Sequence, residues 1–374
     1  MKTIYLDHAS TTRLEPKVLE KMMPYLTDTY GNANSVHAMG REAVNGLDEA
    51  RNIVAKLLGA EFNEIYFTSG GTEGDNWAID GFTKLRGDKN KLVTSKIEHQ
   101  AMLSSIDNLA PLDIQVKKIG VDSKGFINLQ ELKNEVDGNT YLTAVMLANN
   151  EIGTIQPIKE IASYAKEKGS YVFTDAVQAM GAIDINVKDL GVDMLSFSAH
   201  KFGGPKGVGC VYIKNSTKLG NLIVGGHQER SRRGGTSNVA GAIGLAYALK
   251  FTRENLKKDS EYITNLRNYF IDKVLSLNVG ATLNGDRDNR LPNNANITFN
   301  GVNGESLLYK LDLNGVCASL GAACSAGSIE PSYVLREIGL SGVKAKSSIR
   351  FTFGKENTFE EIDGVIKILS SILK

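Results

Sequence analysis

Cysteine and proline are both scarce in this sequence. Its 374 residues include only three cysteines, Cys210, Cys317 and Cys324, and no two of them form a Cys-x-x-Cys pair. This odd number and spacing argue against a disulfide framework and a tetrahedral zinc site, so we expect no bound metal. The cysteine count does not exclude a single reactive thiol. Seven prolines stand against 38 glycines, so we expect many close approaches between backbone segments.

The sequence also lacks an excess of either charge and lacks long apolar runs. Lys and Arg number 43 and Asp and Glu number 42, which gives a net charge of +1. No overall field would therefore draw the chain to nucleic acid or to an anionic membrane. We find no candidate for a membrane span, which needs about 20 mostly apolar residues, and no apolar signal core at the N-terminus. We expect a cytoplasmic protein with neither a nucleic acid nor a membrane as partner.

Short apolar segments alternate with helical patterns through the first two thirds of the chain, as in the amphipathic helix expected at 41–58. This alternation predicts an α/β fold with a mostly parallel sheet, covered on both faces, and a ligand site beyond the carboxyl ends of the strands. After residue 235 a long helical pattern over 255–277 and short strands near 296–299 and 348–353 indicate a second domain. In the first part we expect strands at 64–69, 91–95, 141–148, 171–176 and 194–199.

Three features after these strands together suit one cofactor. The glycine turn at Gly70 and Gly71 leads into a helix expected from Thr72, whose free N–H groups suit a phosphate. Taken alone, such a turn is more often a helix cap. Asp175 ends one strand and Lys201 follows the next, so we expect the two side by side. Pyridoxal phosphate requires a carboxylate beside its ring nitrogen and a lysine that carries it as an imine.

Four further residues are candidates on this rim or near it. His99 follows another strand, where an imidazole would stack on the cofactor ring and relay protons. Gln178, at an expected helix start, would bond the phenolic oxygen of the cofactor, and Asn150 lies on the same rim. Cys324 lies in a stretch of small residues that reads as a loop, which gives a nucleophilic thiol the access it needs.

These residues fall within motifs that resemble, in order from Tyr5 to about Gly354, those of the NifS/IscS-type cysteine desulfurases of the class-V aminotransferase group. The motifs are Tyr5–Thr12, Gly31–His37, Thr68–Asn76, Glu98–Ala101, Asn149–Ile158, Asp175–Ala179, Ser198–Gly207, Arg233–Asn238 and the loop around Cys324.

The resemblance implies a pyridoxal phosphate-dependent transferase of fold type I. A large domain over 15–255 would hold a mostly parallel seven-stranded sheet flanked by helices. A smaller α+β domain, from 1–14 and 256–374, would carry the loop with the catalytic cysteine. The protein would be a homodimer with its active sites at the subunit interface.

The resemblance also implies roles for single residues. Lys201 would hold pyridoxal 5'-phosphate as a Schiff base, Asp175 would pair with its ring nitrogen, His99 would stack on it and Gln178 would touch O3. The phosphate would be held by Gly71, Thr72, Ser198, His200 and, from the other subunit, Thr236. Asn150, beside the cofactor, and Arg350 would hold the substrate carboxylate, and Cys324 would accept the sulfur.

The implied reaction converts L-cysteine to L-alanine and leaves a persulfide on Cys324. The persulfide sulfur would pass to an acceptor or scaffold protein, in iron–sulfur cluster assembly or in thiolation, with a transient iron–sulfur contact through Cys324. Three alternatives stay open: a class-V aminotransferase, a selenocysteine lyase, and a weakly catalytic sulfur-relay protein.

Some features depart from the family pattern. The family loop Ser-Ser-Gly-Ser-Ala-Cys has Leu320 and Ala322 here in place of two serines. Cys317 is an additional thiol that we expect to be a buried small residue. The sequence stops at Lys374, without the longer tail with which some members bind a scaffold, so the acceptor stays open.

Overall fold

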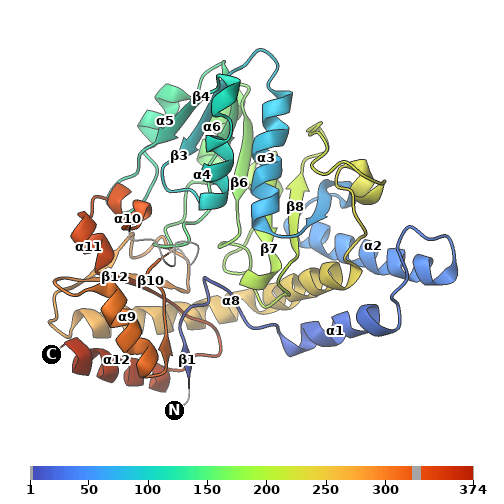
Figure 1. The fold of residues 1–374 in the computed structure, drawn as a ribbon. Coiled ribbons are helices and arrows are strands. Elements are labelled where there is room, and N and C mark those ends of the chain that lie inside the picture. The colour runs from blue at the N-terminus through green and yellow to red at the C-terminus, as the bar shows by residue number, and fades with distance from the viewer. Residues whose placement is uncertain (1–2, 322–329, 374) are drawn as a thin grey trace.

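The computed structural model describes residues 3–321 and 330–373. Its centre is a seven-stranded sheet with the order β2-β8-β7-β6-β5-β3-β4 (Figure 1). Only β8 runs antiparallel to its neighbours in this sheet, so the expectation of a mostly parallel sheet is confirmed. The strands are β2 (Ile65–Thr68), β3 (Lys91–Ser95), β4 (Gln115–Ile119), β5 (Thr140–Ala144), β6 (Tyr171–Asp175), β7 (Met194–Ser198) and β8 (Gly209–Ile213).

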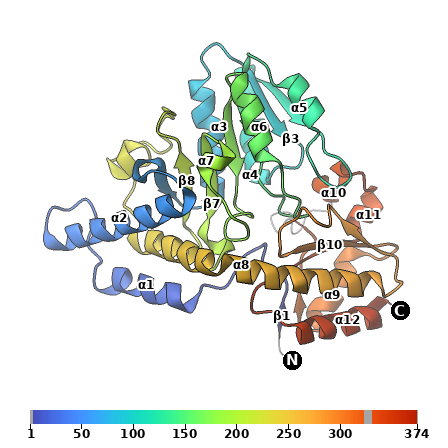
Figure 2. The same cartoon turned by 180° about the vertical axis from the view of Figure 1, so that it is seen from behind.

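Helices cover both faces of this sheet because its side chains alternate between two apolar layers, which together we call the large core. In β6, Phe173 packs in one layer and its neighbour Val172 packs in the other. Helices α3 and α4 cover the first face, and α2, α6 and α7 lie on the second, which Figure 2 shows from behind. The helices of this part are α1 (Pro16–Thr27), α2 (Ala38–Leu58), α3 (Gly71–Leu85), α4 (Gln100–Asp107), α5 (Leu129–Glu135), α6 (Ile158–Glu167) and α7 (Val187–Leu190).

The C-terminal third packs around a second apolar core and a three-stranded antiparallel sheet of order β12-β10-β9. Near the N-terminus, β1 (Ile4–Tyr5) pairs in parallel with β11 (Val316–Cys317), which ties the start of the chain to this part. Its other elements are β9 (Ala281–Asn284), β10 (Asn294–Phe299), α9 (Gly304–Leu313), α10 (Tyr333–Glu337), α11 (Gly342–Lys346), β12 (Ser348–Thr352) and α12 (Phe359–Leu373).

Helix α8 (Val239–Leu275) runs unbroken for 37 residues and joins the two cores (Figures 1 and 2). Leu245 near its start packs in the large core, and Phe270 near its end packs in the second core. The expected start of this helix at 255 is therefore wrong. The expected domain boundary at 255/256 falls inside α8, and it stays a prediction, as does the boundary at 14/15. In the described part of the chain, no helix is long and apolar enough to span a membrane.

Candidate active site

Ten of the twelve residues singled out from the sequence line one cavity, which has about 800 Å³ of empty volume. They are Gly71, Thr72, His99, Asn150, Asp175, Gln178, Ser198, His200, Lys201 and Arg350. Thr236 is exposed and does not line this cavity. Cys324 and Ala322 lie outside the described residues.

The cavity is also lined by residues that were assigned no role from the sequence: Ala9, Ser10, Asp75, Met146 and Val177. Ala9, Ser10, Asp75 and Val177 fall within the family-like motifs, and this position in the motifs is the signal that could have found them. Met146 follows β5 without any local feature that marks it.

The amine of Lys201 is held against the N-terminal segment, which we define as residues 7–12. Lys201 ends the short 3-10 helix η3 (Ala199–Lys201) directly after β7. Its Nζ donates to the backbone oxygens of Ala9 at 2.6 Å and Ser10 at 2.8 Å. Gln178 Nε2 donates to the same oxygen of Ala9 at 2.9 Å. Gln178 lies in a turn and not at a helix start, so that detail of the sequence expectation is wrong.

Two buried carboxyl groups, Asp75 and Asp175, also line the cavity. Asp175 ends β6 at the position paired with Ser196 of β7, three residues before η3 begins, which brings Asp175 and Lys201 to one edge as expected. Burial raises the pKa of Asp175, although His99 and Lys201 act to lower it. Burial and repulsion from Asp175 also raise the pKa of Asp75, which accepts a hydrogen bond from Ser196 Oγ at 2.7 Å. Two buried carboxyls in one wall favour a bound cationic group.

Burial favours the neutral form of both histidines of the cavity. His99 caps helix α4, and its Nδ1 accepts from the N–H of Ala101 at 3.1 Å. Burial lowers the pKa of His99, and burial together with Lys201 lowers the pKa of His200 to about 4. His99 is therefore suited to stack on a ring and exchange protons, and His200 to hydrogen-bond without adding charge.

The start of helix α3 gives the cavity an anion-binding end. Gly70 is the N-cap and provides no side-chain hydrogen bond to the first turn, so the α3 N–H groups there have no capping side chain. A Cβ atom on Gly71 would come within 2.5 Å of Val177 Cγ2, so glycine is required for this close packing. Thr72 and Ser198 add hydroxyls to the same part of the cavity. Such a helix start suits a phosphate.

Arg350 lies at the side of the cavity formed by the small sheet and is 2% exposed. Its Nη2 contacts Asp7 Oδ1 at 3.0 Å and Ser10 Oγ at 2.9 Å, and its Nη1 donates to the backbone oxygen of Asn150 at 2.9 Å. Among the described residues, Arg350 Nε and Asn150 Oδ1 are buried without a hydrogen-bond partner. A buried donor and a buried acceptor on two residues that contact each other suit a ligand with both a carboxylate and an N–H group.

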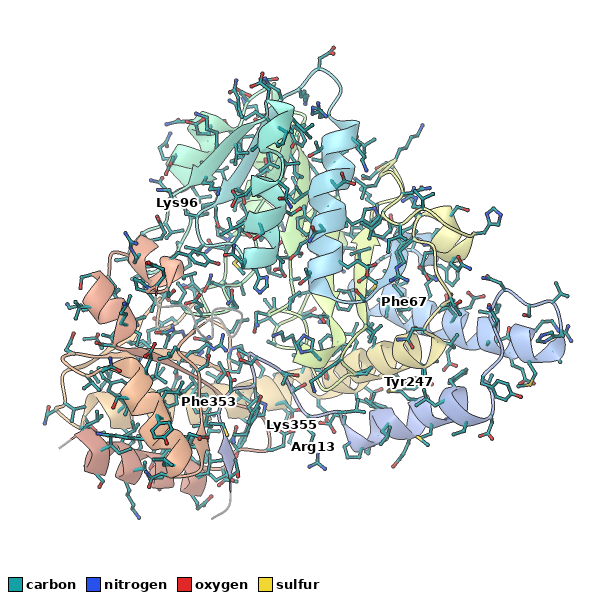
Figure 3. The ribbon with its side chains drawn as sticks, in the orientation of Figure 1. Arg13, Phe67, Lys96, Tyr247, Phe353 and Lys355 are labelled. Carbon is teal, nitrogen blue, oxygen red and sulfur yellow. The ribbon has the colours of Figure 1, made fainter. Side chains whose placement is uncertain are left out.

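A second cavity, of about 870 Å³ of empty volume, shares Lys201 and Gln178 with the first but contains no other predicted site residue. Arg13, Phe353 and Lys355, which Figure 3 labels close together, belong to its lining. The predicted residues therefore select the first cavity as the candidate site.

The thiols that the structure describes are unsuited to nucleophilic attack. Cys210 is buried, and burial strongly raises the pKa of its thiol. Cys317 is half-buried in β11, and not buried as expected, because this two-stranded sheet lies at the edge of the second core. Burial raises the pKa of Cys317 as well. Within residues 3–321 and 330–373, no group of three or more His, Cys, Asp or Glu side chains could hold a metal ion.

Comparison with known proteins gives consistent matches over the whole chain. The family "Aminotransferase class-V" matches residues 4–365. The Clostridium botulinum protein named "Cysteine desulfurase IscS" is 46% identical, and the match covers 100% of this chain and 95% of that protein. A solved structure titled "NIFS-LIKE PROTEIN" superposes with a TM-score of 0.94 at 37% identity, covering 99% of both chains. A structure titled "SspA in complex with cysteine" gives 0.84 at 34% identity, covering 95% of this chain and 100% of that one.

These matches agree with the architecture and with the order of the motifs. The large, mostly parallel sheet flanked by helices and the small antiparallel sheet are those of fold type I. The chain belongs to the class-V aminotransferase family, among its NifS/IscS-type cysteine desulfurases.

Proposed function

We propose that this chain is a cysteine desulfurase that uses pyridoxal 5'-phosphate to transfer sulfur from L-cysteine to Cys324 and releases L-alanine. The observation that carries the proposal is the cavity itself, where Lys201 and Asp175 follow adjacent strands and Arg350 lies at the side. The names of the similar proteins, one of which is in complex with cysteine, support the same reaction.

The residues of the cavity fit the proposed cofactor. The uncapped start of α3 suits its phosphate, and the amine of Lys201 suits covalent attachment of its aldehyde carbon. Asp175 is a buried carboxyl whose pKa burial raises, and a cationic ring nitrogen beside it would favour its ionised form. When bound, the cofactor withdraws electrons from the Cα atom of an amino acid.

The chain's own residues then bind the substrate and move its proton and its sulfur. Arg350 Nε and Asn150 Oδ1, which have no hydrogen-bond partner among the described residues, would hold the amino acid. The Lys201 amine and the neutral His99 would exchange protons with Cα and Cβ. The Cys324 thiolate would form a bond to the substrate sulfur while the carbon–sulfur bond breaks. Carbon keeps that electron pair and takes up a proton, which yields the methyl group of alanine.

We also propose a cytoplasmic homodimer that passes the persulfide sulfur to an acceptor or scaffold protein. Thr236 is exposed and outside its own cavity, which suits a role in the phosphate site of a second copy. Helix α1 has exposed apolar side chains that a second copy would cover, Leu19 at 42%, Met23 at 43% and Leu26 at 56% exposure.

Replacement of Cys324 by alanine separates cofactor binding from sulfur transfer. We expect Cys324→Ala to bind the cofactor normally and to give the same absorbance change with L-cysteine, because neither step needs a thiol. Sulfide and alanine release should fall about a hundredfold or more, because nothing accepts the sulfur. Cys317→Ala is the matched control and should stay active, because burial raises the pKa of Cys317. Near-normal turnover of Cys324→Ala would refute the proposal, as would turnover that requires a 2-oxo acid.

A further inference from the structure

Glu151 directly follows Asn150 in the turn after β5, but its side chain does not line the cavity. The side chain is only 1% exposed. Its backbone is fixed from two sides: its N–H donates to Asn149 Oδ1 at 2.9 Å, and its carbonyl accepts from the Nδ2 atoms of Asn294 at 3.2 Å and Asn296 at 3.1 Å. The backbone from which the Glu151 side chain extends is therefore held in place next to Asn150, the proposed substrate-binding residue.

One oxygen of this carboxylate meets the chain at two places. Ser332 Oγ donates to Glu151 Oε2 at 2.6 Å, and the same hydroxyl caps helix α10 by accepting from the N–H of Leu335. On the other side, a Cβ atom on Gly321 would come within 2.7 Å of Glu151 Oε2, so the backbone of residue 321 lies directly against it. Gly321 and Ser332 come shortly before and shortly after Cys324 in the sequence. A single buried carboxylate thus contacts the chain on both sides of the cysteine.

Neighbouring contacts fix the same two chain ends to the rim of the cavity. Before the cysteine, the N–H and the carbonyl of Ser319 pair with those of Arg350 at 3.1 and 2.7 Å. After it, Tyr333 in α10 donates its hydroxyl to the backbone oxygen of Glu98, which precedes His99. Lys96, labelled in Figure 3, also contacts Glu337 at the end of α10 at 3.5 Å. Of these contacts, the one at Glu151 is the one that involves both ends.

We propose that Glu151 is a positioning residue that holds both ends of the segment bearing Cys324 against the Asn150 rim. The thiol's approach to the substrate sulfur would then depend on the Glu151 carboxylate, although Glu151 touches neither cofactor nor substrate. This inference rests on the proposed sulfur transfer to Cys324, and it names the chemical group that contacts the described chain on both sides of that cysteine.

Rapid-mixing kinetics on the cofactor-loaded enzyme test the proposal. For Glu151→Ala we expect the rate of persulfide formation on Cys324 in a single turnover to fall about tenfold or more, since small displacements of a reacting group are costly. The KM for L-cysteine and the affinity for the cofactor should stay within about twofold, because the cavity lining is unchanged. Glu151→Gln should retain most of the rate, because its amide oxygen still accepts from Ser332. Glu160→Ala, an exposed glutamate of α6, is the control and should behave as the unchanged protein.

Ser332→Ala removes the same hydrogen bond from the other side and remains informative if Glu151→Ala does not fold. It should slow persulfide formation in the same way, and the double variant should be no slower than the slower single variant. The proposal is overturned if folded Glu151→Ala or, in its place, Ser332→Ala forms persulfide at the normal rate. It is also overturned if KM rises as much as the rate falls. Active Cys324→Ala would instead refute the proposed function, which keeps the two failures distinct.

Discussion

At the scale of single residues, three buried carboxyl groups besides Glu151 lie at or beside the candidate site. Asp75, Glu98 and Asp175 are each at most 4% exposed, and burial raises the pKa of all three. No step of the proposed mechanism uses Glu98. It accepts hydrogen bonds from Ser95 Oγ and from the N–H of Met146, and burial still raises its pKa to about 8. This carboxyl therefore links local stability to pH.

Glu98→Gln should reveal that link. Because the pKa of Glu98 is about 8 in the folded protein and ordinarily 4.5, the stabilisation that its proton provides is fully present below pH 4.5 and is lost as pH rises through 8. Glutamine is neutral at every pH, so the melting temperature of the variant relative to the unchanged protein should rise by about 2 °C between pH 6 and 9. Thermal unfolding measured across this range, with exposed Glu20→Gln as control, checks the trend. Parallel curves for Glu98→Gln and the unchanged protein would contradict it.

Most of the cavity could be predicted because its residues follow parallel strands, whose carboxyl ends meet at one edge. Asp175, Lys201 and His99 follow three such strands. Asp75 could not be assigned a role, because it comes from the first turns of α3 and reaches the cavity only through the packing of that helix on β7. The same holds for Ser10, which is brought in by long-range contacts such as that with Arg350.

At the scale of elements, the short 3-10 helix η4 (Gln228–Ser231) is conformationally strained. Three successive non-glycine residues have left-handed φ angles, Glu229 at 45°, Arg230 at 55° and Ser231 at 64°. The strain is held by the buried ion pair of Glu229 with Arg51 at 2.9 Å and by the N–H of Phe67 (Figure 3), which donates to Glu229. Because Thr236 follows shortly after, this strained element fixes the start of the segment that leads to it.

Ser231→Gly should stabilise the protein by about 0.5 kcal/mol. Glycine removes the left-handed penalty of about 1–2 kcal/mol and returns part of that gain through the entropy of the unfolded chain. The same change at Ser104, exposed in helix α4, should destabilise by about 0.5–1 kcal/mol, because its backbone is an ordinary helical one. Urea unfolding of both variants measures the two signs. A loss of stability in Ser231→Gly equal to that in Ser104→Gly would show that η4 carries no strain.

Element boundaries were predicted less well than the elements, for identifiable reasons. The segment 141–148 suggested one strand, but β5 ends at Ala144, because the N–H of Met146 donates to the Glu98 side chain and not to a neighbouring strand. The first part of α8 escaped prediction because it is buried on most sides and therefore shows no amphipathic pattern. Helix α2, with one apolar face and Gly59 at φ 70° as its C-cap, was predicted to within three residues.

At the scale of the whole molecule, the cavity forms only where the two apolar cores meet. Lys201 follows a strand of the large sheet and Arg350 belongs to the small sheet, and both donate hydrogen bonds to Ser10 of the N-terminal segment. Long-range packing of this kind has no local sequence pattern. Composition and periodicity alone could therefore place the site at a sheet edge, but they could not predict which segments from elsewhere in the chain complete the cavity. The proposed role of Thr236 in the cavity of a second copy would be a further long-range contact of this kind.

Mixed dimers test whether each site uses Thr236 of the other subunit. Thr236→Asp should weaken cofactor binding about tenfold in a uniform dimer, because a carboxylate beside a phosphate repels it, and Lys201→Ala should abolish turnover. A dimer of one subunit of each kind then keeps one cavity with an intact Lys201 and, from the partner, an intact Thr236. We expect tagged, purified mixed dimers to have about half the normal turnover and one cofactor bound with normal affinity. If Thr236 serves its own cavity, the site with intact Lys201 would contain the aspartate, and no site with both normal affinity and turnover would remain.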